Sequence, residues 1–178
     1  MNDAFQSVIV GDEEFKRAMD GVVVFSRRPK LAMRDMAAAL EEITEENFSA
    51  QGNPEWKALS EVTIRARLGG GKAYTKKGNL RKPAQRAKEQ MKILQNRGLL
   101  AASVHSKYGD NYTMIGAGGG DPGQYARIHQ LGGQAGRGLS VTLPARPYLP
   151  FSPDLKLQPK AKKDLLKIAT EHLRQATT

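Results

Sequence analysis

The stretch that decides the fold runs from Pro29 to Gly52 and reads PKLAMRDMAAALEEITEENFSAQG. Pro29 suits the first turn of a helix, where its missing N–H costs nothing, and Gly52 suits the residue after the last turn. Acidic residues separate apolar residues that recur at helical spacing, namely Met33, Met36, Leu40, Ile43 and Phe48. We therefore predict a long helix from Pro29 to Gln51, packed on a sheet through its apolar face. A sharper alternative is that its acidic face meets a basic neighbouring subunit.

Turn signals and short apolar runs predict the other elements. A turn at 52–60 carries Trp56 and Leu59, which are three residues apart and can both enter the core if a short helix starts there. The rest is predicted by residue range: a strand at 7–10, a helix at 13–19, an apolar run of undecided type at 22–25, a helix at 84–97, an antiparallel hairpin of 99–105 and 112–116, a loop at 116–123, a short helix or turn at 125–131, a strand at 140–143 and an amphipathic helix at 159–175.

These elements predict an α+β fold. A small antiparallel or mixed sheet packs against the long helix of the N-terminal half and the C-terminal amphipathic helix, with long basic and glycine-rich loops between them. The 178 residues, of which 39% are hydrophobic, fit a single domain over residues 1–178. The chain has no cysteine, which excludes disulfides and thiolate chemistry. Met1–Asp12 lacks a basic segment followed by a long apolar run, so we expect a protein that is neither exported nor membrane-anchored.

Positive charge is concentrated in the middle of the chain. The net charge is −5 over residues 1–64, +10 over 65–97 and +5 over 98–178. Residues 65–83 are also glycine-rich and poor in apolar side chains, which predicts a flexible basic loop. Such a segment either contacts a polyanion or an acidic partner, or is simply a solvated arm. The candidate contact residues are Arg65, Arg67, Lys72, Lys76, Lys77, Arg81, Lys82 and Arg86.

Motifs that would indicate catalysis are missing from the sequence. His105, His129 and His172 share no metal-ligand spacing. Gly69-Gly70-Gly71-Lys72 hints at a phosphate loop, but Ala73 stands where a hydroxyl ligand of magnesium is required. No motif ties a nucleophile or a carboxylate to His129, so a structural histidine is favoured over a hydrolase. We predict no enzyme, no cofactor and no metal site.

Six stretches occur in a specific order and spacing. They are a helix ending in Phe48 and Gln51, Pro54-x-Trp56-x-x-Leu59, Ile93-Leu94 with Gly98-Leu99 and Ser103, Ile115-Gly116, Tyr125-Ala126-x-Ile128-His129-Gln130-x-Gly132, and Ala145-Arg146-Pro147-Tyr148-Leu149. In these stretches the chain resembles the phage virion morphogenesis family, the tail-completion and head-to-tail joining proteins of Mu-like phages. The resemblance extends over residues 31–175 and departs from the family in a long basic insertion between Leu59 and Ile93.

The resemblance implies a non-catalytic virion subunit, assembled in the cytoplasm of the bacterial host and placed at the neck where head meets tail. Its implied partners are further copies of itself in a ring, which we expect to be six-fold, other neck, connector or tail-tube proteins, and packaged DNA, without a membrane. An alternative is a phage-encoded DNA-binding protein that uses residues 65–97 without reading sequence. Expected contacts to a neighbouring subunit or partner are Tyr125, His129, Gln130, Arg146, Pro147, Tyr148 and Phe151. His129 and Gln130 can hydrogen-bond to the segment around Arg146 either within one subunit or across a boundary.

Overall fold

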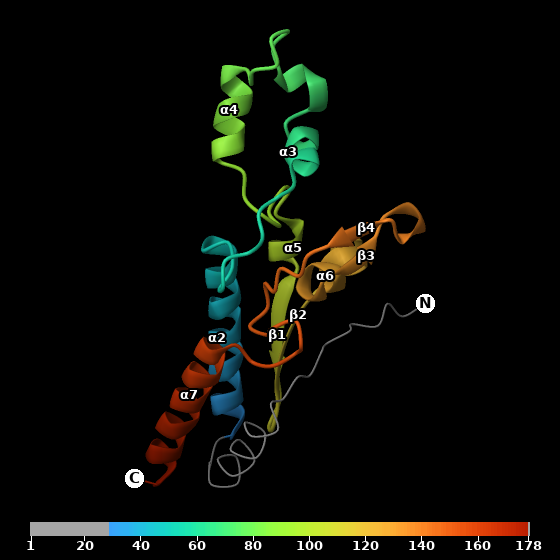
Figure 1. Ribbon diagram of the computed structural model, residues 1–178. Helices are drawn as coiled ribbons and strands as arrows, with labels where there is room; N and C mark the ends of the chain where they lie inside the picture. Colours follow the sequence, from blue (N-terminus) through green and yellow to red (C-terminus); the bar gives the residue numbers. More distant parts are fainter. Residues whose placement is uncertain (1–28, 178) are drawn as a thin grey trace.

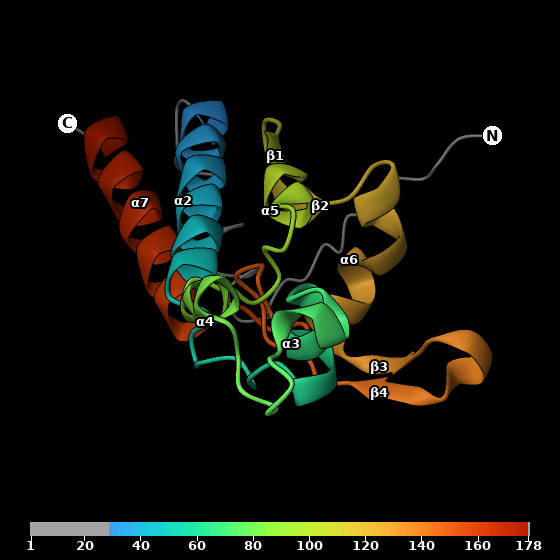
Figure 2. The same ribbon diagram turned by 90° about the horizontal axis from the view of Figure 1, so that it is seen from above.

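The computed structural model describes residues 29–177, and the elements predicted at 7–10, 13–19 and 22–25 lie outside the described residues. Four layers follow one another across the body of the molecule: α7 (Pro159–Thr177), α2 (Pro29–Ser49), a hairpin of β1 (Val104–Tyr108) and β2 (Thr113–Ala117), and α6 (Asp121–Leu131) (Figure 2). Two further segments project from this body (Figure 1). The predicted α+β fold is confirmed.

The central helix α2 is buried on two sides. Its predicted apolar stripe lies in the interior, and the small residues Ala32 and Ala37 are buried beside it. On one side α7 packs with Ala161, Leu165 and Ala169 buried, so that small side chains let the two helix axes approach. Both helices lie where the 3.6-residue period predicts them, and they position the rest of the body.

The hairpin packs on the other side of α2. Val104 pairs with Ala117 and Tyr108 with Thr113 in an antiparallel register, as predicted. The free edge of β1 faces α2, where the backbone N–H of Ser106 donates to the Glu41 carboxylate at 2.7 Å. One prediction is wrong: the first arm of the hairpin begins at Val104, because the preceding residues form the single helical turn α5 (Leu99–Ala102). So short an apolar run does not distinguish strand from helix.

The fourth layer, α6, begins earlier than predicted. The glycine loop covers Gly118–Gly120, all with positive φ, and the helix then starts at Asp121 with Pro122 in its first turn. After α6 the chain forms a second hairpin, made of β3 (Gly133–Ala135), the short helix η2 (Arg137–Leu139) and β4 (Val141–Leu143). The strand at β4 was predicted and its partner β3 was not.

The other projection is the basic arm, which we define as residues 61–90. It consists of α3 (Glu61–Arg67), the short helix η1 (Gly70–Ala73) and α4 (Lys82–Glu89), with an isolated bridge between Tyr74 and Leu80. The arm stands away from the body at the top of Figure 1. The segment predicted as a loop thus contains short regular elements, and its flexibility in solution stays a prediction.

The predicted helix over 84–97 is wrong at its C-terminal end. It stops at Glu89, and Leu94 has a φ of 59°, outside the helical range. The backbone N–H of Ile93 donates at 2.6 Å to the side-chain oxygen of Gln51, and the Gln95 amide donates to the Phe48 carbonyl at 2.9 Å. These contacts with the end of α2 replace the helical hydrogen bonds and override the apolar spacing.

The core lies where α2, β2, α6 and α7 meet the segment 145–151. Phe48 contacts the Trp56 ring edge-on at 5.9 Å between centroids and the Tyr148 ring at 5.4 Å. Trp56 is buried, which confirms its predicted place in the core. No helix among residues 29–177 combines the length and apolar character that a membrane span requires.

Candidate functional site

The side chain of Gln130, on α6, holds the segment that follows β4. Its Oε1 accepts hydrogen bonds from the backbone N–H groups of Tyr148 at 3.1 Å and Leu149 at 3.0 Å. Its Nε2 donates to the Phe151 carbonyl at 2.8 Å. We call this arrangement the Gln130 latch. Because Gln130 is buried, the latch supplies hydrogen-bond partners to backbone groups that have no access to water.

Tyr148 is the centre of the segment held by the latch. It is 1% exposed, and its hydroxyl donates to the Ala126 carbonyl of α6 at 3.3 Å. Burial raises the pKa of the phenol, which therefore stays protonated and acts as a donor. The Asn47 amide of α2 donates to the Tyr148 carbonyl at 3.1 Å and to Gln158 Oε1 at 3.2 Å. Tyr148 thus joins α2 to α6.

Arg146 fixes the turn that carries Trp56. Its Nε donates to the Lys57 carbonyl at 3.0 Å, and a terminal nitrogen donates to the Ala58 carbonyl at 3.2 Å. The Trp56 indole donates to the carbonyl of the next residue, Pro147, at 3.1 Å. Burial, reinforced by the charge of Arg67, lowers the pKa of Arg146 from its ordinary value, and the group remains a cation. Arg146 therefore binds backbone carbonyls of its own chain.

The His129 ring lies edge-on to the Tyr125 ring, with 5.7 Å between the ring centroids. Burial lowers its pKa first, and the charges of Arg146 and Arg67 lower it further, so the imidazole is neutral near pH 7. Its Nδ1 is buried without a hydrogen-bond partner among the described residues. A general base also needs a nucleophile to activate, and no hydroxyl or carboxylate of the described residues bonds to this ring. The arrangement fits a structural histidine.

A groove of about 450 Å³ opens beside the latch. Its walls are the glycine loop, α6 and the end of the segment 145–155, and the apolar residues lining it include Ile115, Leu131 and Phe151. Apart from the latch residue, its polar side chains are those of Gln124, Arg127 and Tyr148. This set contains no acid–base pair. Within the part of the chain that the structure describes, no three or more His, Asp and Glu side chains come together to hold a metal ion.

The structure brings the predicted contact residues together inside one chain. Gln130, Arg146, Tyr148 and Phe151 are buried, and Tyr125, His129 and Pro147 are half-buried. Of the two arrangements weighed from the sequence, hydrogen bonding of Gln130 within a subunit is the one observed. A contact of the half-buried members with a neighbour stays a prediction.

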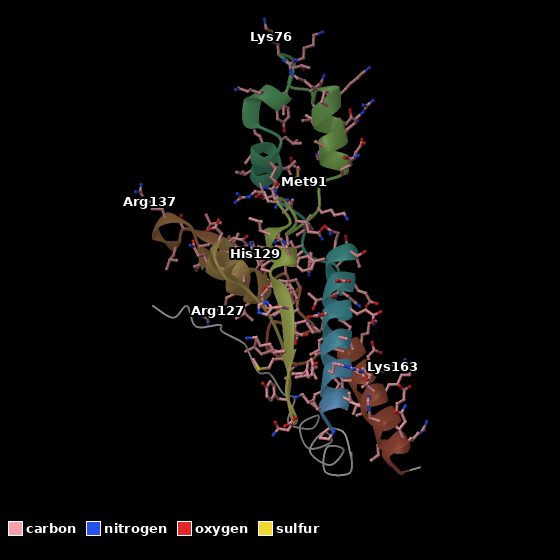
Figure 3. All side chains as sticks on the ribbon, turned by 180° about the vertical axis from the view of Figure 1, so that it is seen from behind. Lys76, Met91, Arg127, His129, Arg137 and Lys163 are labelled. Carbon is pink, nitrogen blue, oxygen red and sulfur yellow. The ribbon has the colours of Figure 1, made fainter. Side chains whose placement is uncertain are left out.

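The predicted polyanion contacts divide into two groups. Arg67 is half-buried at the root of the arm, where its guanidinium donates to the Lys92 carbonyl at 2.8 Å. The other seven are exposed on the arm: Arg65, Lys72, Lys76, Lys77, Arg81, Lys82 and Arg86. Figure 3 shows Lys76 at the far tip of the arm and Met91 near its root.

Two features of the structure were not predicted from the sequence. Asn47 occupies the next inward position after Ile43 in the stripe of α2, and a polar residue at such a position was the available signal for a buried contact. The hairpin β3–β4 exposes Leu139 (64%) and Val141 (49%), with Arg137 near its tip (Figure 3). Its signal was the glycine-containing turn at 136–138 between two short segments.

Comparison with known proteins gives a consistent result. The model of the phage virion morphogenesis family matches residues 10–173. The chain is 28% identical over 141 residues to the "Mu-like prophage FluMu G protein 2" of Haemophilus influenzae, covering 79% of this chain and 80% of that protein. It is 35% identical over 129 residues to the "Putative capsid assembly protein G" of Escherichia phage Mu, covering 68% of this chain and 69% of that protein. No solved structure matches the chain.

Proposed function

The chain belongs to the phage virion morphogenesis family, and from this premise we propose that it joins head to tail or completes the tail as a non-catalytic subunit of a ring at the neck. In this proposal the ring is six-fold, and its neighbours are other neck, connector or tail-tube proteins. The observation that carries the proposal is the extent of the family match, which runs from residue 10 to residue 173.

The surface of the single chain supports a role in assembly. A ring built from head-to-tail contacts needs two different patches on each subunit. The hairpin β3–β4 offers one, because Leu139 and Val141 are exposed on a projecting element rather than packed on the body. Half-buried Tyr125, His129 and Pro147 are proposed contacts on the body. The buried members of the latch act indirectly, by holding these surfaces in place.

The interior supports a non-catalytic role. The side chains of Gln130 and Arg146, which belong to two of the sequence motifs, and of Asn47 on α2 are used in hydrogen bonds to backbone carbonyls and amides. Side chains that serve the fold in this way are not available to a substrate. The family consists of structural morphogenesis proteins that are generally non-catalytic, which agrees with this arrangement.

The phage Mu relative favours a second candidate function. Its name assigns that protein to capsid assembly, and the present chain is 35% identical to it. A role in building the head predicts a different defect from a role at the junction. Loss of a capsid assembly protein gives malformed or missing heads, whereas loss of a junction protein leaves well-formed heads that are not attached to tails.

Electron microscopy of particles made without this protein tests the proposal. A phage in which its gene carries an early stop codon is propagated with and without a plasmid copy. We expect separate heads and tails, or tails of abnormal length, and recovery of intact particles with the plasmid. Normal infectious particles without the plasmid contradict any role in assembly. Malformed heads favour a function in capsid assembly over one at the head–tail junction.

A further inference from the structure

The basic arm carries exposed cations that pair with no carboxylate in the part of the chain that the structure describes. Besides the seven predicted residues, Lys88 is exposed on α4, which gives eight exposed cations, while the acidic residues of the arm are Glu61 and Glu89. Among residues 29–177 no carboxylate lies within salt-bridge distance of any of these eight cations. Carboxylates of residues 29–177 therefore do not neutralise the positive charge of the arm.

On the C-terminal helix of the same protein, in contrast, lysines are paired with carboxylates. On α7, Lys160 pairs with Asp164 at 2.9 Å and Lys167 with Glu171 at 3.8 Å, both four residues apart. On α4, Lys82 and Arg86 are also four residues apart, but both are cations and repel each other. Repulsion between like charges thus destabilises α4. This pattern is expected when the negative charge that balances the arm belongs to a ligand.

The arm offers little to a protein partner. No residue of α3 or α4 is buried, and the large apolar side chain exposed there is Val62, at 80%. Stable protein interfaces are built around buried aromatic and apolar anchors, which this surface does not supply. Dense, regularly spaced negative charge is the better complement. Duplex DNA carries one charge per about 1.7 Å, and an eight-residue helix such as α4 is about 12 Å long, so α4 spans several phosphates.

The cations of the arm point to phosphate contact without base readout. The Arg65 guanidinium lies 5.5 Å from the centre of the Tyr74 ring, and Arg81 Nε donates to the Tyr74 carbonyl at 3.2 Å, so both arginines are oriented by the arm. The lysines are exposed, among them Lys76 at the tip (Figure 3). The helices of the arm have seven and eight residues and lack the paired arrangement of a helix-turn-helix reader.

We propose that the basic arm binds the phosphates of double-stranded DNA independently of base sequence. This activity is separate from the assembly role, and either can fail while the other holds. If each of the eight cations meets one phosphate, the logarithm of the binding constant falls with the logarithm of the salt concentration with a slope of about −7. That slope corresponds to a roughly 10⁴-fold loss of affinity between about 50 mM and about 200 mM salt.

Fluorescence anisotropy with a short labelled duplex and the full-length protein tests the proposal. The arm variant is Lys72→Gln, Lys76→Gln, Lys77→Gln and Lys82→Gln, which removes four exposed charges whose ammonium groups form no hydrogen bond with residues 29–177. We expect the magnitude of the salt slope to fall by about 3.6, because each lost phosphate contact removes about 0.9. Two duplexes of unrelated sequence should bind the protein equally.

A matched control removes the same charge elsewhere. Lys30→Gln, Lys156→Gln, Lys163→Gln and Lys167→Gln lowers the net charge by the same amount on exposed positions outside the arm. The control should keep the slope of the unaltered protein. Equal losses in both variants mean that net charge alone attracts DNA, and this overturns the proposal. Binding to polyglutamate but not to the duplex also overturns it, in favour of an acidic protein partner.

Discussion

Tyr148 is hydrogen-bonded to α6 at two positions, one of which is the side chain of Gln130. The backbone N–H of Tyr148 donates to the Gln130 side chain. The Tyr148 hydroxyl donates to the carbonyl of Ala126, which lies four residues before Gln130 in the helix. The segment after β4 is thereby attached to α6 at two points that lie one helical turn apart. Phe48 packs on the Tyr148 ring from α2, so the same residue also connects the helix to the central layer. Removing either partner should therefore loosen the whole body.

Gln130→Ala should lower the free energy of unfolding by about 3 kcal/mol, because it leaves two backbone amides and one carbonyl buried without partners. Urea denaturation followed by circular dichroism measures the change. Gln124→Ala, at an exposed position of the same helix, is the control and should stay within about 0.5 kcal/mol of the unaltered protein. Equal stability of the two variants contradicts the role of the latch.

Gly132→Ala should destabilise the protein through a steric clash as well as backbone strain. The φ of Gly132 is 73°, and a Cβ added there lies 2.7 Å from the backbone nitrogen of Ala145. Gly78→Ala, with a φ of 81° and open space around its Cβ, introduces the strain alone, which costs about 1–2 kcal/mol. We expect a larger loss at Gly132, measured as the difference in thermal melting midpoint. A loss no larger than at Gly78 contradicts this account of the glycine.

His129 should make the stability dependent on pH near neutrality. Burial and the charges of Arg146 and Arg67 lower its pKa in the folded chain, so the unfolded chain binds more protons. Stability then rises with pH, and it is lost as the pH falls below the unfolded value of about 6.5. Urea midpoints at about pH 7.5 and about pH 5.5 bracket this window, which lies above the ordinary carboxylate range.

The fall in stability between these two pH values should be smaller in His129→Gln than in the unaltered protein. His105→Gln provides the control for a histidine outside this cluster of cations. An unchanged pH dependence in His129→Gln shows that the protonation of this residue is not linked to folding.

The double variant Leu139→Ser and Val141→Ser should impair assembly without unfolding the chain. Both side chains are exposed, so the free energy of unfolding should change by no more than about 0.5 kcal/mol. The yield of infectious particles from a plasmid copy should fall, as counted by plaque assay. Val62→Ser removes an exposed apolar side chain of the basic arm and should leave the yield unchanged. Full complementation by the double variant removes the hairpin from the proposed ring contacts.

The sequence predicts elements whose own periodicity determines them. The stripe of α2, the turn of the β1–β2 hairpin and the amphipathic face of α7 are local patterns, and all three elements form, although the first arm of the hairpin is shorter than predicted. The predictions fail where a contact distant in sequence decides the backbone. Ile93 leaves the helix because its N–H binds the side chain of Gln51, 42 residues away. No local pattern carries that information.

For the candidate site, the sequence motifs brought attention to these residues but did not decide between the two predicted arrangements. The two motif segments around Gln130 and Arg146 do come together, as one of the two predicted arrangements requires. Their polar groups bind backbone atoms of the same chain, because burial leaves each of them with a donor or acceptor to satisfy. A motif rich in Tyr, His and Arg has the composition of an interface and of a hydrogen-bonded interior alike, so composition does not separate the two.

Ala73 is the buried apolar residue of the basic arm, so packing places few demands on the other positions there. We expect most substitutions, insertions and deletions in the arm to leave the body intact, since surface segments with few tertiary contacts tolerate changes of length. During phage evolution this segment can therefore diverge quickly, while the neighbourhood of Tyr148 is constrained by many simultaneous contacts. A chimera that carries the arm of a relative on this body is expected to fold.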